Sequence, residues 1–149
     1  THNKGIDAQV NKYGDGDLLI VQGPLTLNWK DRNKWGFPRI ENGEISQRNL
    51  PTPQRVDLWI KQSISVKGKE EWVFVKIHTH GAPERNADVL LGEPMNAMYS
   101  YLEQNYNDGK KYALHYVSAR EMYNIIKAAE AGERGDPKDY RNYIILRNN

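Results

Sequence analysis

Two histidines end the most apolar stretch of this chain. Residues 72–81 read WVFVKIHTHG, so His78 and His80 stand two positions apart and Gly81 follows them directly. On a β-strand, side chains two residues apart project to the same side. Two imidazoles in this arrangement could share a metal ion, or divide the roles of general acid and general base. The structural alternative is one packed histidine and one solvated histidine.

A complete metal site needs three or four ligands, and the histidine pair supplies only two. The side chains that could complete it have no diagnostic spacing: Glu84, Asp88, Glu93 and His115. We therefore leave the metal ligands undetermined. The chain has no cysteine, which excludes thiolate ligands, a cysteine nucleophile and disulfide bonds. It also has no Walker loop and no GxGxxG, GxSxG or HExxH motif, which excludes the usual nucleotide-binding, α/β-hydrolase and zincin assignments.

The residues before the histidine pair predict the element that positions it. Aromatic and β-branched residues dominate positions 72–79, which favours a buried strand over a helix. Alternation puts Trp72, Phe74 and Lys76 on the same face as the histidines and leaves the other face apolar. A strand that is buried at its start and ends in ionisable side chains is typical of the centre of an α/β fold, where active sites lie at the carboxyl ends of the strands.

Helices are predicted near residues 52–65, 93–106 and 119–131. Thr52 and Pro53 fit the entrance of the first helix, and Ser118 with Glu121 forms the capping-box pattern at the start of the third. Further strands are expected at 17–22, 25–29 and 112–117. The alternation of helices and strands after residue 52 predicts an α/β fold with a small, mainly parallel sheet and covering helices.

The length of 149 residues predicts a single α/β domain, with loosely packed ends at 1–16 and 133–149. Lysine and arginine number 21, aspartate and glutamate number 19, and the two signs are interspersed. This balance lacks the basic field that nucleic-acid binding needs. No segment has the length and apolarity of a membrane span, and the start has no signal-peptide pattern. We expect a soluble protein that binds neither nucleic acid nor membrane, and its localisation stays unknown.

The aromatic residues suggest a carbohydrate partner. Four tryptophans and nine tyrosines provide flat apolar surfaces with polar edges. Trp35 lies in a long Gly- and Pro-containing connection, 30–51, where it could stack on a sugar ring, and loops of this length are often functional. Lys76 shares the face of His78 and could contact substrate or form a structural ion pair. We assign substrate binding to Trp35, Lys76 and Glu84.

The catalytic assignment adds an arginine to the histidine pair. Arg120 stands at the start of the third predicted helix, directly after a predicted strand. The amides at the start of a helix favour an anion, such as a developing carboxylate or oxyanion. We therefore assign catalysis to His78, His80 and Arg120.

Several blocks of the sequence resemble the C-terminal part of bacterial polysaccharide-deacetylase-like proteins of the NodB (carbohydrate esterase) type. The blocks are 22–25, 39–43, 51–56, 72–82 and 115–124, and the most specific are HTHG at 78–81 and AREMYN at 119–124. The resemblance implies part of a distorted β/α barrel, a divalent metal in the full-length protein, and hydrolysis of acetyl groups on a polysaccharide. It also implies that His78 matches the histidine that serves the family as general acid.

The chain departs from that family in lacking the paired aspartates and the H-[ST]-x-x-H metal motif, which would lie upstream of Thr1. We therefore expect a fragment, equivalent to the second half of the barrel and inactive alone. A half barrel leaves sheet edges unpaired and apolar faces uncovered, which predicts a homo-oligomer. The alternative function is a non-catalytic carbohydrate-binding or structural α/β module. Metal content and acetate release distinguish the two.

Overall fold

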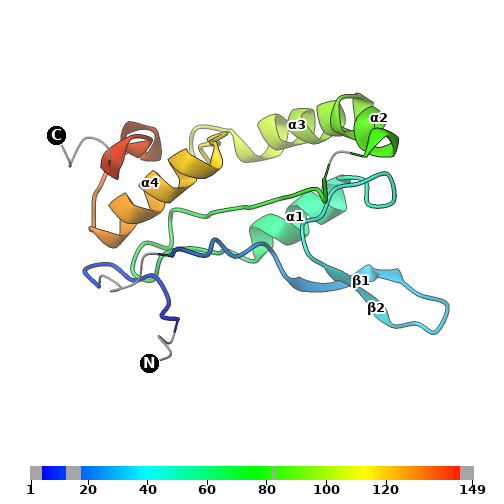
Figure 1. Ribbon diagram of the computed structural model, residues 1–149, viewed down its shortest axis with the longest axis horizontal. Coiled ribbons are helices and arrows are strands. Elements are labelled where there is room, and N and C mark those ends of the chain that lie inside the picture. Colours follow the sequence, from blue (N-terminus) through cyan, green and yellow to red (C-terminus); the bar gives the residue numbers. More distant parts are fainter. Residues whose placement is uncertain (1–4, 13–17, 82, 145–149) are drawn as a thin grey trace. The chain divides into compact units, whose positions relative to one another are not determined.

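Figure 1 shows the computed structural model of the chain, which describes residues 5–12, 18–81 and 83–144. The chain divides into two compact units. The first unit combines residues 1–21, 64–74 and 115–149, and the second combines 22–63 and 75–114. Each unit is therefore assembled from segments that are distant in the sequence.

The first unit is built around helix α4, Ala119–Glu130, followed by the short 3₁₀ helix η2, Pro137–Tyr140. One face of α4 is buried because Ile125, Ile126, Ala128 and Ala129 recur at helical spacing. These residues pack with Val66, Trp72 and Phe74 in one apolar cluster. The start of the histidine-bearing segment, at Trp72 and Phe74, is thus part of this core.

The capping box predicted for α4 is confirmed. The backbone N–H of Glu121 donates to Ser118 Oγ, and the backbone N–H of Ser118 donates to Glu121 Oε2 at 2.7 Å. These two bonds satisfy amides that have no partner within the helix. The hydrogen bonds from Ser118 also hold the pKa of the Glu121 carboxyl below its usual value.

The second unit holds the remaining regular elements. Strands β1, Thr26–Arg32, and β2, Pro38–Glu41, form an antiparallel hairpin. The helices are α1, Pro53–Lys61; η1, Glu84–Asn86; α2, Ala87–Leu90; and α3, Glu93–Tyr106. Buried side chains of α1, α2 and α3 form a second apolar cluster with Ile45 of the loop after β2; the helical members are Val56, Trp59, Val89 and Met98. Helices α1 and α3 are further linked because Tyr101 Oη and Tyr106 Oη both donate to Asp57 Oδ1, at 2.8 and 2.7 Å.

The three long helices agree closely with the sequence prediction. The helix predicted near 93–106 is α3, and the one predicted near 119–131 is α4. The first ends at Lys61 rather than near residue 65, because Ser63 takes a left-handed φ of +50°. Thr52 stands at the N-cap position of α1, and its side chain makes no capping hydrogen bond there.

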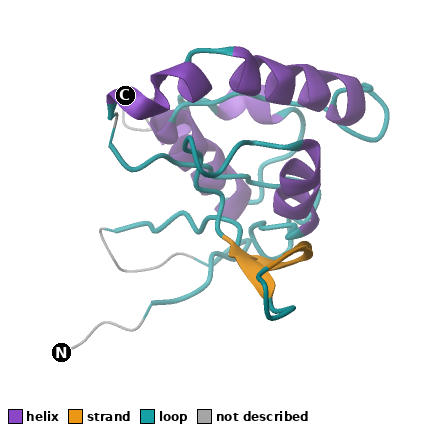
Figure 2. Ribbon diagram, turned by 90° about the vertical axis from the view of Figure 1, so that its right-hand side faces the viewer, coloured by secondary structure: helices purple, strands orange, loops and turns teal. Residues whose placement is uncertain are grey.

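The predicted small, mainly parallel sheet with covering helices is wrong. The one sheet of the described residues is the two-stranded antiparallel hairpin, coloured orange in Figure 2. Within the described residues, 73–77 pair with no strand. The described parts of the predicted strands 17–22 and 112–117 do not pair with a strand either. A central strand would also bury both faces, whereas Val73 is 42% exposed. A barrel-like fold is not shown.

The described part of the chain contains no helix that is both long enough and apolar enough to cross a membrane.

Replacing the helix cap tests the local structure of the first unit. We expect Ser118→Ala to lower the free energy of unfolding by about 1 kcal/mol, because the backbone N–H of Glu121 loses the Ser118 hydroxyl as its acceptor. Urea unfolding followed by circular dichroism measures this change. Ser118→Thr keeps the hydroxyl and should stay near the wild-type value; an equal loss in both variants would contradict a capping role.

Candidate functional site

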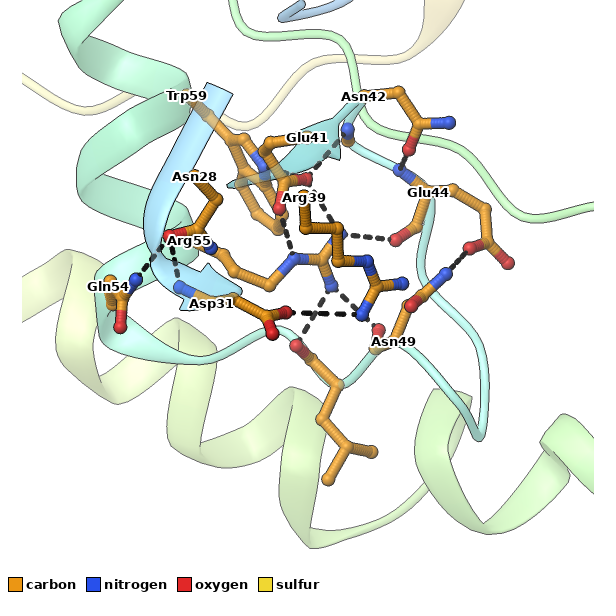
Figure 3. Close-up of polar contacts among 12 residues, drawn as sticks. Asn28, Asp31, Arg39, Glu41, Asn42, Glu44, Asn49, Gln54, Arg55 and Trp59 are labelled. Atoms are coloured by element: carbon orange, nitrogen blue, oxygen red, sulfur yellow. Dashed lines mark hydrogen bonds and ion pairs between the residues drawn. The ribbon is translucent and has the colours of Figure 1, made fainter. Parts of the chain in front are cut away.

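A buried ion pair organises the second unit. Glu41 is 3% exposed, and its carboxylate accepts hydrogen bonds from Arg55 Nε at 2.7 Å and Arg55 Nη2 at 2.8 Å (Figure 3). Trp59 Nε1 and the backbone N–H of Gly43 also donate to this carboxylate, at 2.8 and 3.0 Å. Burial alone would raise the pKa of Glu41, but these hydrogen bonds outweigh it and hold the pKa below the usual 4.5.

The same arginine fixes the loop that follows β2. Arg55 Nη1 donates to the carbonyls of Asn49 and Leu50, at 2.8 and 2.9 Å, and Nη2 donates to the carbonyl of Glu44 at 2.6 Å. Figure 3 shows these bonds converging on the guanidinium from the loop and from Glu41. Arg55 therefore uses its donors to hold residues 44–50 against helix α1.

Within this loop, residues 46–49 form a tight turn. The backbone N–H of Asn49 donates to the Ser46 carbonyl at 2.9 Å, and the reverse bond measures 3.3 Å. At the turn, the backbone N–H of Gln47 donates to Asn86 Oδ1 at 3.1 Å. Asn86 is 4% exposed and belongs to η1. Its buried side-chain amide therefore joins η1 to the loop after β2, across 39 residues of sequence.

The histidine segment runs beside the start of the same loop. The backbone N–H of His78 donates to the Gly43 carbonyl at 3.1 Å, and the backbone N–H of Ile45 donates to the His78 carbonyl at 2.8 Å. This is a single parallel bridge between Glu44 and His78. Gly43 eases this approach: its φ is +73°, and a Cβ at this position would lie 3.3 Å from the Lys76 carbonyl oxygen of the histidine segment and 2.9 Å from Pro24 Cγ.

The two imidazoles lie together, as the sequence predicts for side chains two positions apart. Their ring centroids are 5.1 Å apart and the rings are nearly perpendicular. His80 is exposed and His78 is partly buried. Burial, followed by the charges of Lys76 and His80, lowers the pKa of His78 below 6.5, while Glu44 opposes this shift. The lowered pKa favours the neutral form of the His78 imidazole.

Three buried side-chain atoms of the described ranges have no hydrogen-bond partner: Asn49 Oδ1, His78 Nδ1 and Thr79 Oγ1. All three belong to the loop and the histidine segment just described. Unsatisfied buried polar atoms are rare in folded proteins, so their concentration in these two segments distinguishes this part of the second unit.

A polar pocket with a volume of about 490 Å³ opens beside these segments. It is lined by side chains from the loop after β2, from the histidine segment and from η1: Asn42, Glu44, Ser46, Gln47, Arg48, Asn49, His80, Arg85 and Asn86. Amide, carboxylate, guanidinium and imidazole groups therefore face one space. This lining can donate to and accept from the hydroxyl groups of a polar ligand.

The predicted substrate-binding residues lie outside this lining. Trp35 stands between β1 and β2, is 74% exposed, and has Lys34 Nζ at 5.3 Å from its ring centroid. Lys76 is partly buried and forms no ion pair with a described residue. Glu84 is exposed at the start of η1, and its neighbour Arg85 lines the pocket instead.

The predicted catalytic residues do not all share one unit. His78 and His80 belong to the second unit, whereas Arg120 belongs to the first. Arg120 Nη1 donates to Asn142 Oδ1 at 3.0 Å, on the segment that follows η2. His115, which the sequence offered as a possible metal ligand, also belongs to the first unit. Its Nε2 lies 3.4 Å from Asp136 Oδ1.

The residues present do not complete a metal site. Throughout residues 5–12, 18–81 and 83–144, no three His, Asp or Glu side chains are grouped so that they could hold a metal ion. The histidine pair by itself offers two ligands where three or four are needed.

Sequence reasoning missed the pocket residues Arg48, Asn49, Arg85 and Asn86. Arg48 and Asn49 lie in the polar loop after β2, and Arg85 and Asn86 lie in the three-residue helix η1, which is too short to show periodicity. The available signal was the length of the 30–51 connection, which is unusual for a loop without a role. No family model, curated protein or solved structure matches the chain. The chemistry of the site is therefore argued from its own residues.

Removing Arg55 tests whether the buried pair organises the second unit. We expect Arg55→Met to lower the free energy of unfolding by about 3–5 kcal/mol, because the Glu41 carboxylate stays buried without its partner. Arg39→Met is the matched control. It breaks the exposed Arg39–Asp31 pair at 3.4 Å and should cost no more than about 1 kcal/mol. Equal losses in the two variants would show that the buried pair has no special role.

Acid titration tests the same carboxylate. The pKa of Glu41 is lower in the folded chain than in the unfolded chain. Its contribution to stability is therefore complete above the usual value of 4.5, and it disappears as the pH falls through the folded-state pKa. Urea unfolding at a series of pH values should show this loss in the wild type and a smaller slope in Glu41→Gln. An unchanged slope would mean that other carboxyl groups cause the acid sensitivity.

Proposed function

We propose that the chain supplies the sugar-binding and imidazole-bearing part of a carbohydrate deacetylase, which hydrolyses acetyl groups on a polysaccharide. The observation that carries the proposal is a histidine of the pair lining a polar pocket, with the second histidine against it. His80 lines the pocket, and His78 contacts His80 ring to ring at 5.1 Å. The resemblance of the HTHG and AREMYN blocks to NodB-type proteins supports the same chemistry.

The pocket suits a sugar because its groups are fixed before a ligand arrives. Arg55 holds the carbonyls of Glu44 and Asn49 in the loop after β2, and the hydrogen bond from Gln47 to Asn86 joins this loop to η1. The backbone that carries the amide groups of the lining is fixed in this way, so these groups can meet ring hydroxyls with little further ordering, which favours binding. Trp35, 74% exposed between the strands of the hairpin, offers a stacking surface for a further sugar ring.

Because the lowered pKa favours a neutral imidazole, we assign His78 first as a general base. A neutral imidazole accepts the proton of water as the water oxygen attacks the acetyl carbonyl. The imidazolium so formed then donates this proton to the leaving sugar nitrogen or oxygen, and acetate departs. Because Nδ1 of His78 is buried, Nε2 is the nitrogen that exchanges the proton. His80 is the imidazole that contacts the sugar.

A non-catalytic carbohydrate-binding module is the second candidate. The rigid hydrogen-bonding lining of the pocket favours it, since binding requires this lining and does not require a proton-transfer group. The two candidates differ in acetate release and agree in sugar binding.

Replacing His78 tests the catalytic role. We expect the chain alone to bind acetylated oligosaccharides without releasing acetate, and release to require the upstream part that the resemblance implies. In a protein extended upstream, His78→Ala should lower acetate release roughly a hundredfold or more, with binding and melting temperature little changed. Lys61→Gln, at an exposed lysine at the end of α1, is the control.

Unchanged acetate release in His78→Ala would remove His78 from catalysis. A large drop in the melting temperature of His78→Ala would show that His78 has a structural role in packing. If the extended protein binds sugar and releases no acetate, the binding-module candidate is the correct one.

A further inference from the structure

The charges around the pocket identify the kind of glycan that fits it. We propose that the ligand is an anionic polysaccharide, bound through its carboxylate or phosphate groups by Arg48 and Arg85. This inference rests on the proposed function and narrows it, because sugar binding alone does not specify a charge. The arginines line the same pocket as His80 and Glu44.

Arg48 and Arg85 differ from the other arginines of the second unit. Arg39 pairs with Asp31, Arg55 pairs with Glu41, and Arg32 Nε donates to the Trp29 carbonyl at 2.8 Å. By contrast, Arg48 and Arg85 are both exposed, and neither forms an ion pair or a side-chain hydrogen bond with any residue that the structure describes. Two guanidinium groups therefore reach the pocket with their donors available.

The fold places these two arginines on the same pocket by fixing their neighbours. The hydrogen bond from the backbone N–H of Gln47 to Asn86 Oδ1 joins the two loops. Arg48 directly follows Gln47, and Arg85 directly precedes Asn86. The joint is rigid because Asn86 is buried and its own backbone N–H donates to the Pro83 carbonyl at 2.8 Å.

The one carboxylate of the lining is already engaged. Asn49 Nδ2 donates a hydrogen bond to Glu44 Oε2, which Figure 3 shows at the edge of the loop. With Glu44 at −1 and the arginines at +2, the lining carries a net charge of +1 when His80 is neutral. The charge balance of the pocket thus favours an anion over a neutral sugar.

Guanidinium groups select for planar or tetrahedral oxyanions. Each can donate two parallel hydrogen bonds to a carboxylate or phosphate, and these charge-assisted bonds are stronger than bonds to a neutral hydroxyl. A polysaccharide that repeats such a group can present an anion to both arginines while its hydroxyls meet the amides of the lining. Uronic-acid polymers and phosphorylated glycans share this chemistry.

Matched charged and uncharged sugars test the proposal on the 149-residue chain. The probes are a galacturonic acid hexamer, its methyl ester, a chitin hexamer and a phosphorylated mannan oligosaccharide, with affinity measured by isothermal titration calorimetry. We expect the acid to bind about tenfold more tightly than its methyl ester, which keeps the sugar rings and removes the charge. The difference should shrink as salt rises from about 0.1 M to about 1 M. The tighter of the uronate and phosphate probes identifies the preferred group.

Single substitutions then locate the charge effect. Arg48→Gln and Arg85→Gln should each weaken binding of the preferred anionic probe about threefold, so that together they account for the tenfold preference, and should leave the methyl ester unaffected. Lys110→Gln removes the same charge from an exposed residue of the second unit that does not line the pocket, and it should change neither affinity. An equal loss in Lys110→Gln would attribute the effect to overall charge and overturn the proposal.

The outcomes separate this inference from the proposed function. Equal affinity for the acid and its ester would overturn the anionic selectivity and leave sugar binding intact. Tighter binding of the neutral chitin hexamer than of both charged probes would overturn it in the same way. Failure of every glycan to bind would overturn the proposed function together with this inference.

Discussion

The buried contact between Glu41 and Arg55 is the interaction on which the second unit depends. Neither charge could be buried alone, because the cost of removing an ion from water is several kcal/mol. The Glu41 carboxylate accepts hydrogen bonds from Arg55, Trp59 and a backbone amide. The remaining donors of Arg55 bind carbonyls of the loop. One arginine thus joins the end of β2, helix α1 and the loop 44–50, although these segments share no regular sheet.

The pocket follows from that anchored loop. Ile45 anchors the loop in the apolar cluster of the second unit, and hydrogen bonds set the shape of the remaining, polar part. Arg55 fixes its start and end, the 46–49 turn closes it, and Asn86 ties it to η1. The histidine segment approaches its start closely, and a side chain at Gly43 would crowd the Lys76 carbonyl oxygen. A binding surface made from loops gains its rigidity in this way from buried polar contacts.

Local patterns in the sequence predicted the elements that depend on near neighbours. Helices α3 and α4 and the capping box at Ser118 were all predictable, because helical periodicity and capping involve residues three or four positions apart. The pairing of the histidine side chains was predictable for the same reason, since it requires only that two residues project to one side. The parallel sheet was not correct, because alternation identifies the faces of an extended segment and says nothing about its neighbours.

The sequence by itself determined the helices, the juxtaposition of His78 and His80, and the absence of cysteine chemistry. Only the tertiary structure decided that 72–80 is an extended segment with one bridge, and that Arg120 belongs to a different unit from the histidines. It also decided which polar loop residues meet at the pocket. The physical reason is that such contacts join residues tens of positions apart, as in the bond from Gln47 to Asn86. Their formation depends on how the buried Glu41–Arg55 pair folds the chain, which no local pattern records.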